Sequence, residues 1–197
     1  MKPLYGLVIC GGESSRMGRD KSLIEYYGKP QRNHIYEMLA PLCEKVFISC
    51  NKRQASTLLN YPIITDADHY QGIGPMASLL SAFEHYPDAN FLLVACDYPL
   101  LTSADLSLLL EAWDLSHEAL TFFNQRSGFA EPLLGIYSAC CYPALLEQFR
   151  SGNHSLQEFL RHSAARQIVA PFPENVSSTD TPEAYEAAIL QLKKKRS

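Results

Sequence analysis

The most apolar run of the chain, residues 91–96 (F-L-L-V-A-C), shows no alternation of polar and apolar side chains. A strand with one face in water alternates with a period of two, whereas a strand covered on both faces does not. The run therefore predicts a strand at the centre of a parallel sheet. Apolar runs at residues 4–10, 45–50 and 62–64 also stop abruptly at polar residues, and helical spacing of apolar residues follows some of them. This succession predicts βαβ units and an α/β fold.

The second half of the chain predicts a departure from a purely parallel sheet. Strand patterns at residues 118–123 and 131–137 are joined by a short polar segment that contains Gly128. Two strands with so short a connection predict a hairpin, and we therefore expect a mixed sheet.

Helix signals divide the rest of the chain into short elements, and no linker or repeat interrupts them. We expect one domain over residues 1–197, because its length suits a single core. Helices are predicted at 31–42, from Pro75 onward, at 102–113 with Thr102 as its cap, at 142–149, from Ser155 to about 162, and after Thr181; a last strand is predicted at 166–170.

Composition excludes several classes of protein. Apolar residues make up 47% of the chain, which is enough for a packed core, and the net charge of −4 argues against a general nucleic-acid binder. No apolar run reaches the roughly 18 residues that span a bilayer, so we expect no membrane segment. The six cysteines include no C-x-x-C pair, which disfavours a zinc site and suits a reducing, cytoplasmic location.

A phosphate-binding loop is predicted directly after the first strand, in the stretch V-I-C-G-G-E-S-S-R-M-G-R-D-K. Gly11 and Gly12 leave no Cβ to obstruct a close ligand, and their N–H groups can point at phosphate oxygens. Arg16 adds a planar set of donors and Lys21 a compact positive charge. The spacing matches neither the Walker loop nor the dinucleotide fingerprint. The alternative, a tight turn flanked by solvated basic residues, explains fewer of these residues.

Three further strand ends have a polar residue where ligands of parallel sheets collect: Asn51, Asp66 and Asp97. Asp97 follows six apolar residues and precedes Tyr98-Pro99. A carboxylate held on a stiff strand beside a phosphate loop suits Mg²⁺, which prefers oxygen ligands. The alternative role for Asp97 is a turn former before X-Pro.

The glycine loop resembles the N-terminal signature of the molybdenum cofactor guanylyltransferases, roughly L-A-G-G-x-S-x-R-M-G-x-D-K. Cys10 stands where that family has Ala. The matching residues are Gly11, Gly12, Ser14, Arg16, Met17, Gly18, Asp20 and Lys21.

The resemblance continues in order along most of the chain. Asn51 and Asp66 match the family's nucleotide-contacting positions after its second and third strands, and Asp97 matches its Mg²⁺-binding aspartate. Residues 74–77 (G-P-M-A) resemble the family's G-P-L-A-G, with Ser78 in place of the last glycine. Residues 131–137 match E-P-L-x-G-x-Y in outline, and 179–183 match N-x-N-T-P-E with Asp180 in place of Asn.

The resemblance implies a Rossmann-like three-layer sandwich of the nucleotide-diphospho-sugar transferase kind, with a mostly parallel, mixed sheet. It implies transfer of GMP from GTP to the terminal phosphate of molybdopterin, with Mg²⁺ as cofactor and release of pyrophosphate. Protein partners would be enzymes of cofactor biosynthesis or acceptor molybdoenzymes. The implied catalytic residues are Arg16, Lys21 and Asp97; the nucleotide-binding residues are Ile9, Cys10, Gly11, Gly12, Lys21, Asn51, Asp66 and Asp97; the metal ligand is Asp97, with Asp180 as a second site residue.

Two other functions remain open from the sequence. One is a cytidylyltransferase of the same cofactor or a sugar-phosphate nucleotidyltransferase, whose loops more often have Ala-Gly where this chain has Gly11-Gly12. The other is a nucleotide-binding protein without turnover, which would have lost a phosphate cation or the metal carboxylate. The presence of Arg16, Lys21 and Asp97 favours the enzyme.

Overall fold

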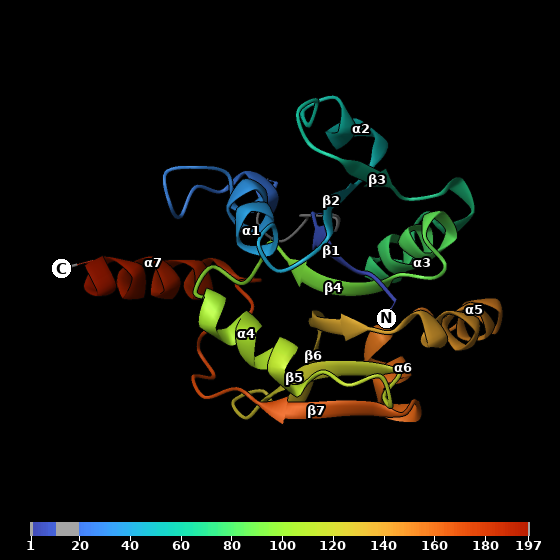
Figure 1. Cartoon of the computed structure of the whole chain (residues 1–197). Coiled ribbons are helices and arrows are strands. Elements are labelled where there is room, and N and C mark those ends of the chain that lie inside the picture. The colour runs from blue at the N-terminus through green and yellow to red at the C-terminus, as the bar shows by residue number, and fades with distance from the viewer. Residues whose placement is uncertain (1, 11–19, 197) are drawn as a thin grey trace.

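A mixed sheet with helices on both faces forms the core of the molecule (Figure 1). The computed structural model describes residues 2–10 and 20–196. In that part of the chain seven strands pair in the order β3-β2-β1-β4-β6-β5-β7. The strands are β1 Leu4–Ile9, β2 Lys45–Cys50, β3 Ile63–Thr65, β4 Asn90–Ala95, β5 Ala119–Asn124, β6 Phe129–Tyr137 and β7 Ala165–Val169.

Strand β6 is antiparallel to both of its neighbours, β4 and β5, while every other pairing is parallel. The predicted hairpin and the mixed sheet are therefore confirmed. Strand β6 begins at Phe129, two residues before the predicted start, because Phe129 pairs with Asn124 across the turn. Since β6 runs backwards, its first residues lie at the sheet edge where the parallel strands end.

Helices cover both faces of the sheet, as a three-layer sandwich requires. Helices α1 and α4 lie on one face, and α3, α5 and α6 lie on the other (Figure 1). The helices are α1 Gln31–Leu39, α2 Lys52–Ala55, α3 Pro75–His85, α4 Ser103–Ala112, α5 Tyr142–Arg150, α6 Leu156–His162 and α7 Pro182–Arg196; short 3-10 turns are η2 Lys21–Leu23, η3 Asp68–Tyr70 and η4 Ala139–Cys141.

Strand β4 lies at the centre of the core. All six of its residues are buried, and Phe91 to Val94 have no exposed surface. It pairs with β1 on one side and with β6 on the other. The prediction of a central strand covered on both faces is confirmed, with bounds one residue earlier than expected.

The predicted helix starts are confirmed by their hydrogen bonds. Thr102 and Asp105 form a reciprocal capping box at α4, and the Ser155 side chain accepts from the N–H of Glu158 at α6. The first predicted helix is shorter than expected, because α1 ends at Leu39 instead of residue 42. Helix α2 was not expected, since four residues are too few to show a period.

The cysteines of the structure are free thiols, and Cys10 Sγ lies 3.6 Å from Cys96 Sγ at the ends of adjacent strands. Within residues 2–10 and 20–196, no helix combines the length and apolar character needed to cross a bilayer.

Gly135, at the middle of β6, provides a test of this packing. A Cβ there would lie 2.5 Å from the carbonyl oxygen of Leu120 and 2.5 Å from Thr121 Cγ2. We expect Gly135→Ala to lower the free energy of unfolding by about 3 kcal/mol or more, because a backbone atom cannot yield as a side chain can. Urea denaturation followed by circular dichroism measures the change.

Gly152→Ala is the control for this substitution. Gly152 has a φ of 82° but no heavy atom within 4 Å of its added Cβ. Only backbone strain applies there, and we expect a loss of about 1 kcal/mol. Equal losses for the two variants would contradict the close approach of β5 to Gly135.

Candidate functional site

The carboxyl ends of the parallel strands form one edge of the sheet, and the predicted site residues of the described chain lie along it. Ile9 ends β1 and Cys10 follows it, Asn51 follows β2, and Asp66 follows β3. Asp97 comes two residues after the end of β4. This arrangement agrees with the general placement of ligand sites at the carboxyl ends of parallel strands.

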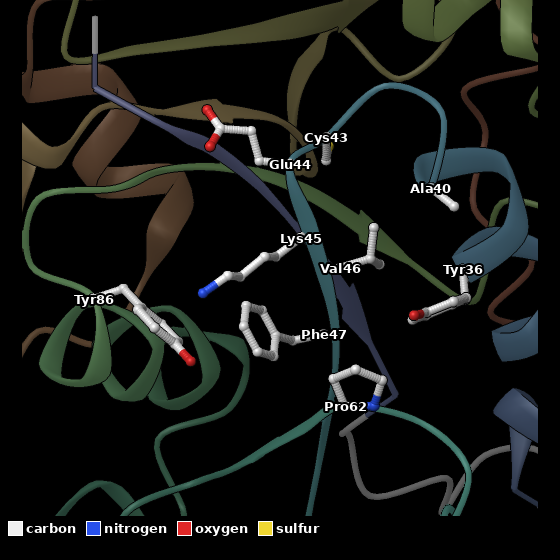
Figure 2. Close-up of a pocket in the computed structure, with 9 residues that line it drawn as sticks. All are labelled: Tyr36, Ala40, Cys43, Glu44, Lys45, Val46, Phe47, Pro62 and Tyr86. Atoms are coloured by element: carbon white, nitrogen blue, oxygen red, sulfur yellow. The ribbon is translucent and has the colours of Figure 1, made fainter.

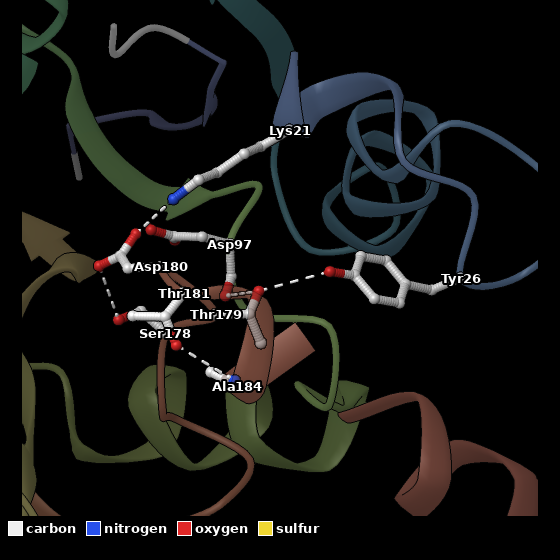
Figure 3. A network of polar contacts seen from close by, with 8 residues as sticks. All are labelled: Lys21, Tyr26, Asp97, Ser178, Thr179, Asp180, Thr181 and Ala184. Atoms are coloured by element: carbon white, nitrogen blue, oxygen red, sulfur yellow. Dashed lines mark hydrogen bonds and ion pairs between the residues drawn. The ribbon is translucent and has the colours of Figure 1, made fainter. Parts of the chain in front are cut away.

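Lys21, Asp97 and Asp180 meet at this edge although they are distant in sequence. Lys21 Nζ lies 2.5 Å from Asp180 Oδ1, and the Asp97 carboxylate points toward both (Figure 3). Lys21 begins the 3-10 turn η2, and Asp180 lies two residues before α7. The structure therefore brings together the predicted cation, the predicted metal carboxylate and the second site residue.

Asp97 is held in an electrostatically unfavourable position. Burial and, to a lesser extent, the neighbouring Asp180 carboxylate raise the pKa of Asp97 to about 7, although the Lys21 ammonium opposes the rise. Its Oδ1 atom is buried and accepts no hydrogen bond from the residues that the structure describes. A carboxylate with a buried and unused oxygen is a suitable ligand for a cation.

The segment that precedes α7 is tied to the end of β4 by hydrogen bonds. The backbone N–H of Thr179 donates to the carbonyl oxygen of Asp97 at 2.8 Å, and its hydroxyl donates to the same oxygen at 3.1 Å. Tyr26 Oη lies 3.4 Å from Thr179 Oγ1, and the N–H of Ala184 donates to Thr181 Oγ1, as Figure 3 shows. These hydrogen bonds hold Thr179 and Thr181, the residues on either side of Asp180. Asp180 consequently faces Asp97.

Glu131 is a further acidic residue beside this group, and the sequence suggested it only through the E-P-L match. Its Oε2 accepts from Tyr98 Oη at 2.8 Å, and its Oε1 accepts from Asn124 Nδ2 at 2.9 Å. Burial raises the pKa of Glu131, while these two hydrogen bonds lower it. Glu131 reaches the site because the antiparallel strand β6 begins at this edge.

Asp66 is held by two serine hydroxyl groups. Its Oδ1 accepts from Ser78 Oγ at 3.1 Å and from Ser49 Oγ at 3.4 Å, and burial raises its pKa against the effect of these bonds. The residue that departs from the family's glycine, Ser78, thus has a specific contact. It fixes the carboxylate that the sequence placed near the nucleotide.

Asn51 lies at the start of α2 and contacts Gln54. Its Oδ1 accepts from the N–H of Gln54 at 3.0 Å, and its own N–H donates to Gln54 Oε1 at 3.2 Å. The predictions for Gly11, Gly12 and Arg16 fall outside the described residues, so their placement stays a prediction.

A hollow of about 370 Å³ lies at the opposite edge of the sheet, at the amino end of β2 (Figure 2). Lys45, Phe47 and Tyr86 line one part of it and Tyr36 another. The hollow is not lined by Lys21, Asp97 or Asp180, nor by Asp66.

The chain is similar to known proteins over most of its length. Residues 6–168 match the MobA-like NTP transferase domain. The chain is 34% identical over 185 residues to the molybdenum cofactor biosynthesis bifunctional protein of Synechocystis, covering 93% of this chain and 53% of that protein. The chain thus spans about half the length of that relative.

Two further similarities extend over whole proteins. The probable molybdenum cofactor guanylyltransferase of Trichormus variabilis is 30% identical over 196 residues, covering 97% of this chain and 92% of that protein. The crystal structure of molybdopterin-guanine dinucleotide biosynthesis protein A from Archaeoglobus fulgidus superposes with a TM-score of 0.80 at 20% identity. That superposition covers 96% of this chain and 99% of the other, and it shows the same fold.

The raised pKa of Asp97 predicts a pH-dependent effect of Asp97→Asn on stability. Between the unfolded value near 3.8 and the folded value of about 7, the folded protein holds a proton that the unfolded chain releases. Wild-type stability therefore falls as pH rises through this interval, by up to about 1.4 kcal/mol per pKa unit. Since Asn has no such proton, we expect Asp97→Asn to be more stable than wild type at pH 8 and no more stable at pH 4. Thermal denaturation in a chelator measures this difference.

Asp105→Asn is the matched control, because Asp105 is a buried aspartate whose carboxylate has good hydrogen-bond partners. Its carboxylate accepts from the N–H and the hydroxyl of Thr102 and from Asn175 Nδ2. We expect this variant to lose about 1–3 kcal/mol of stability at pH 8. A loss of stability in Asp97→Asn at pH 8 would contradict the unfavourable burial of Asp97.

Proposed function

The chain belongs to the MobA-like NTP transferase domain family, and we propose that it transfers GMP from GTP to the terminal phosphate of molybdopterin, releasing pyrophosphate. The proposed substrates follow from the guanylyltransferase among its relatives. The observation that carries the proposal is the meeting of Lys21, Asp97 and Asp180 at one edge of the sheet. A cation beside two carboxylates provides what a nucleoside triphosphate and a divalent metal require.

The triphosphate is proposed to lie along the loop after β1. Lys21 would contact its phosphates, and the sequence assigns the same role to the Gly11-Gly12 backbone and to Arg16. Asn51 and Asp66 follow the next two strands along the edge, beside the ends of β1 at Ile9 and Cys10, and they would contact the nucleoside.

Asp97 fits the role of a Mg²⁺ ligand, and Asp180 fits that of a second. Oδ1 of Asp97 is buried without a hydrogen-bond donor among the described residues. Across the ranges 2–10 and 20–196, no cluster of three or more His, Cys, Asp or Glu side chains could hold a metal. Two carboxylates nonetheless suffice for Mg²⁺, which commonly takes its other ligands from water and substrate phosphates. The metal would neutralise charge on the reacting phosphates.

The reaction needs alignment and charge stabilisation more than a protein nucleophile. An oxygen of the molybdopterin phosphate forms a bond to the α-phosphorus of GTP. The bond from that phosphorus to the oxygen bridging to the β-phosphate breaks, and the pyrophosphate takes the electron pair. The attacking phosphate is already ionised at neutral pH, so no general base is required. Lys21 and Arg16 would offset the charge that develops on the pyrophosphate.

Asp97→Ala is the direct test of the proposed metal carboxylate. We expect pyrophosphate release from GTP, Mg²⁺ and molybdopterin to fall about a hundred-fold or more, because the metal that would neutralise the reacting phosphates loses a proposed ligand. Unfolding by urea should show a folded protein. Turnover at the wild-type rate would contradict the assignment, and no release by the wild-type protein with any acceptor would favour a nucleotide binder without turnover.

Lys21→Ala tests the proposed triphosphate contact. We expect the affinity for GTP to fall about ten-fold or more while the affinity for guanosine changes little, because Lys21 is proposed to contact only phosphate. Calorimetric titration with both ligands measures the ratio. Lys29→Ala is the control, since Lys29 forms a 2.6 Å ion pair with Glu37 on the surface. A parallel loss of both affinities in Lys21→Ala would argue for a role in folding.

The choice of base is tested by competition between nucleotides. We expect GTP to support pyrophosphate release and CTP to support little or none at equal concentration, as the guanylyltransferase relatives suggest. A preference for CTP would assign the chain to the cytidylyltransferase alternative while leaving the roles of Lys21 and Asp97 intact.

A further inference from the structure

Gln54 lies on α2 and joins two parts of the proposed nucleotide site that are distant in sequence. Its Nε2 donates to Asp20 Oδ2 at 2.8 Å, and its Oε1 accepts from the backbone N–H of Asn51 at 3.2 Å. Its backbone N–H donates to Asn51 Oδ1 at 3.0 Å. The side-chain amide thus connects the end of the predicted phosphate loop to the end of β2.

The chemistry of the two partners fixes the orientation of this amide. A carboxylate can only accept, so the nitrogen of Gln54 must face Asp20; a backbone N–H can only donate, so the oxygen must face Asn51. Neither Glu nor a hydrocarbon side chain of the same length reproduces both contacts. Gln is therefore the side chain that this position requires.

Asp20 transmits the contact to Lys21, its neighbour in sequence. Its Oδ1 accepts from the N–H of Ser22 at 2.9 Å and from the Ser22 hydroxyl at 2.7 Å, which caps the turn η2 that begins at Lys21. One oxygen of Asp20 thus holds the turn, and the other is held by Gln54. A displacement of Asp20 would move Lys21 with it.

Helix α2 is anchored on its other side by a buried arginine. Arg32, which is 5% exposed, donates to the hydroxyl and the carbonyl oxygen of Thr57 at 3.2 and 3.3 Å. The Thr57 hydroxyl in turn donates to the carbonyl oxygen of Gln54 at 2.7 Å. Gln54 therefore makes its contacts from a fixed backbone.

We propose that Gln54 is a positioning residue for the nucleotide, one that sets the distance between the phosphate-binding Lys21 and the nucleoside-contacting Asn51. The inference rests on the proposed function, since it assigns both ends to one nucleotide. The side chain of Gln54 acts through Asp20 and Asn51, and we assign it no contact with the reacting phosphorus or the metal. Its loss is therefore expected to raise the KM for GTP and to leave kcat at saturating GTP nearly unchanged.

The test is a pair of variants that together exchange the amide of Gln54 and the carboxylate of Asp20. Gln54→Glu keeps the shape of the side chain but places a carboxylate against Asp20, and we expect its affinity for GTP to fall about ten-fold or more. The double variant Gln54→Glu with Asp20→Asn restores a donor facing an acceptor, because Asn Nδ2 takes the place of Asp20 Oδ2. We expect it to recover most of the affinity.

Gln148→Glu is the matched control for the change in charge. Gln148 Nε2 donates to the carbonyl oxygen of Ser155 at 2.9 Å, and Gln148 lies on α5, away from α2 (Figure 1). We expect its affinity for GTP and its kcat to equal those of wild type. Calorimetric titration with GTP and Mg²⁺, without acceptor, measures binding independently of turnover.

The possible outcomes separate the inference from the function on which it rests. Weak binding in Gln54→Glu with recovery in the double variant supports the inference. If wild type binds GTP and Gln54→Glu binds it equally well, the inference is overturned and the proposed function stands. If both variants bind weakly and also melt at lower temperature, Gln54 is structural and the inference is overturned. Failure of wild type to bind GTP at all would overturn the proposed function together with the inference.

Discussion

The buried carboxylate oxygen of Asp97, directly after β4, is the constraint on which the arrangement of the site depends. Strand β4 pairs with β1 and β6 and is buried along its whole length, so it cannot shift to bring Asp97 into water. The negative charge of the Asp97 carboxylate must therefore be compensated by groups that come to it. Lys21 provides a positive charge there, and the Thr179 backbone and hydroxyl bind the carbonyl oxygen of Asp97. These contacts bring the segment before α7 onto the centre of the sheet.

The reversal of β6 explains how the two halves of the sheet contribute to one site. Strands β3, β2, β1 and β4 are parallel, so the residues that follow them lie along one edge. A parallel strand next to β4 would bring its last residues there. Strand β6 instead brings its first residues, and Glu131 binds Tyr98 directly after Asp97. The proposed nucleotide side is thus built from the ends of parallel strands, while the other side of the site is built from the start of a hairpin strand and the segment before α7.

Local signals in the sequence were sufficient to predict most elements, and they were insufficient to predict which elements meet. The apolar run of β4 and the caps at Thr102 and Ser155 depend on neighbours within a few residues, and the structure confirms them. Lys21 and Asp180 are separated by 159 positions, and only the fold or a resemblance to a known family could pair them. The proposed role of Gln54 could not be predicted from the sequence, because α2 is one turn long and a single glutamine in a polar segment has no distinguishing pattern.

The charge at Asp180 bears on how the proposed site could accept a triphosphate. The resemblance places an asparagine at this position, whereas the carboxylate here raises the pKa of Asp97 and also pairs with Lys21. One lysine facing two carboxylates leaves a net negative charge, which would repel a triphosphate if nothing else intervened. A divalent metal bound by the two carboxylates, as proposed above, would reverse the sign of the local charge. Metal and nucleotide are therefore expected to bind together, because each supplies the opposite charge that the other needs at this site.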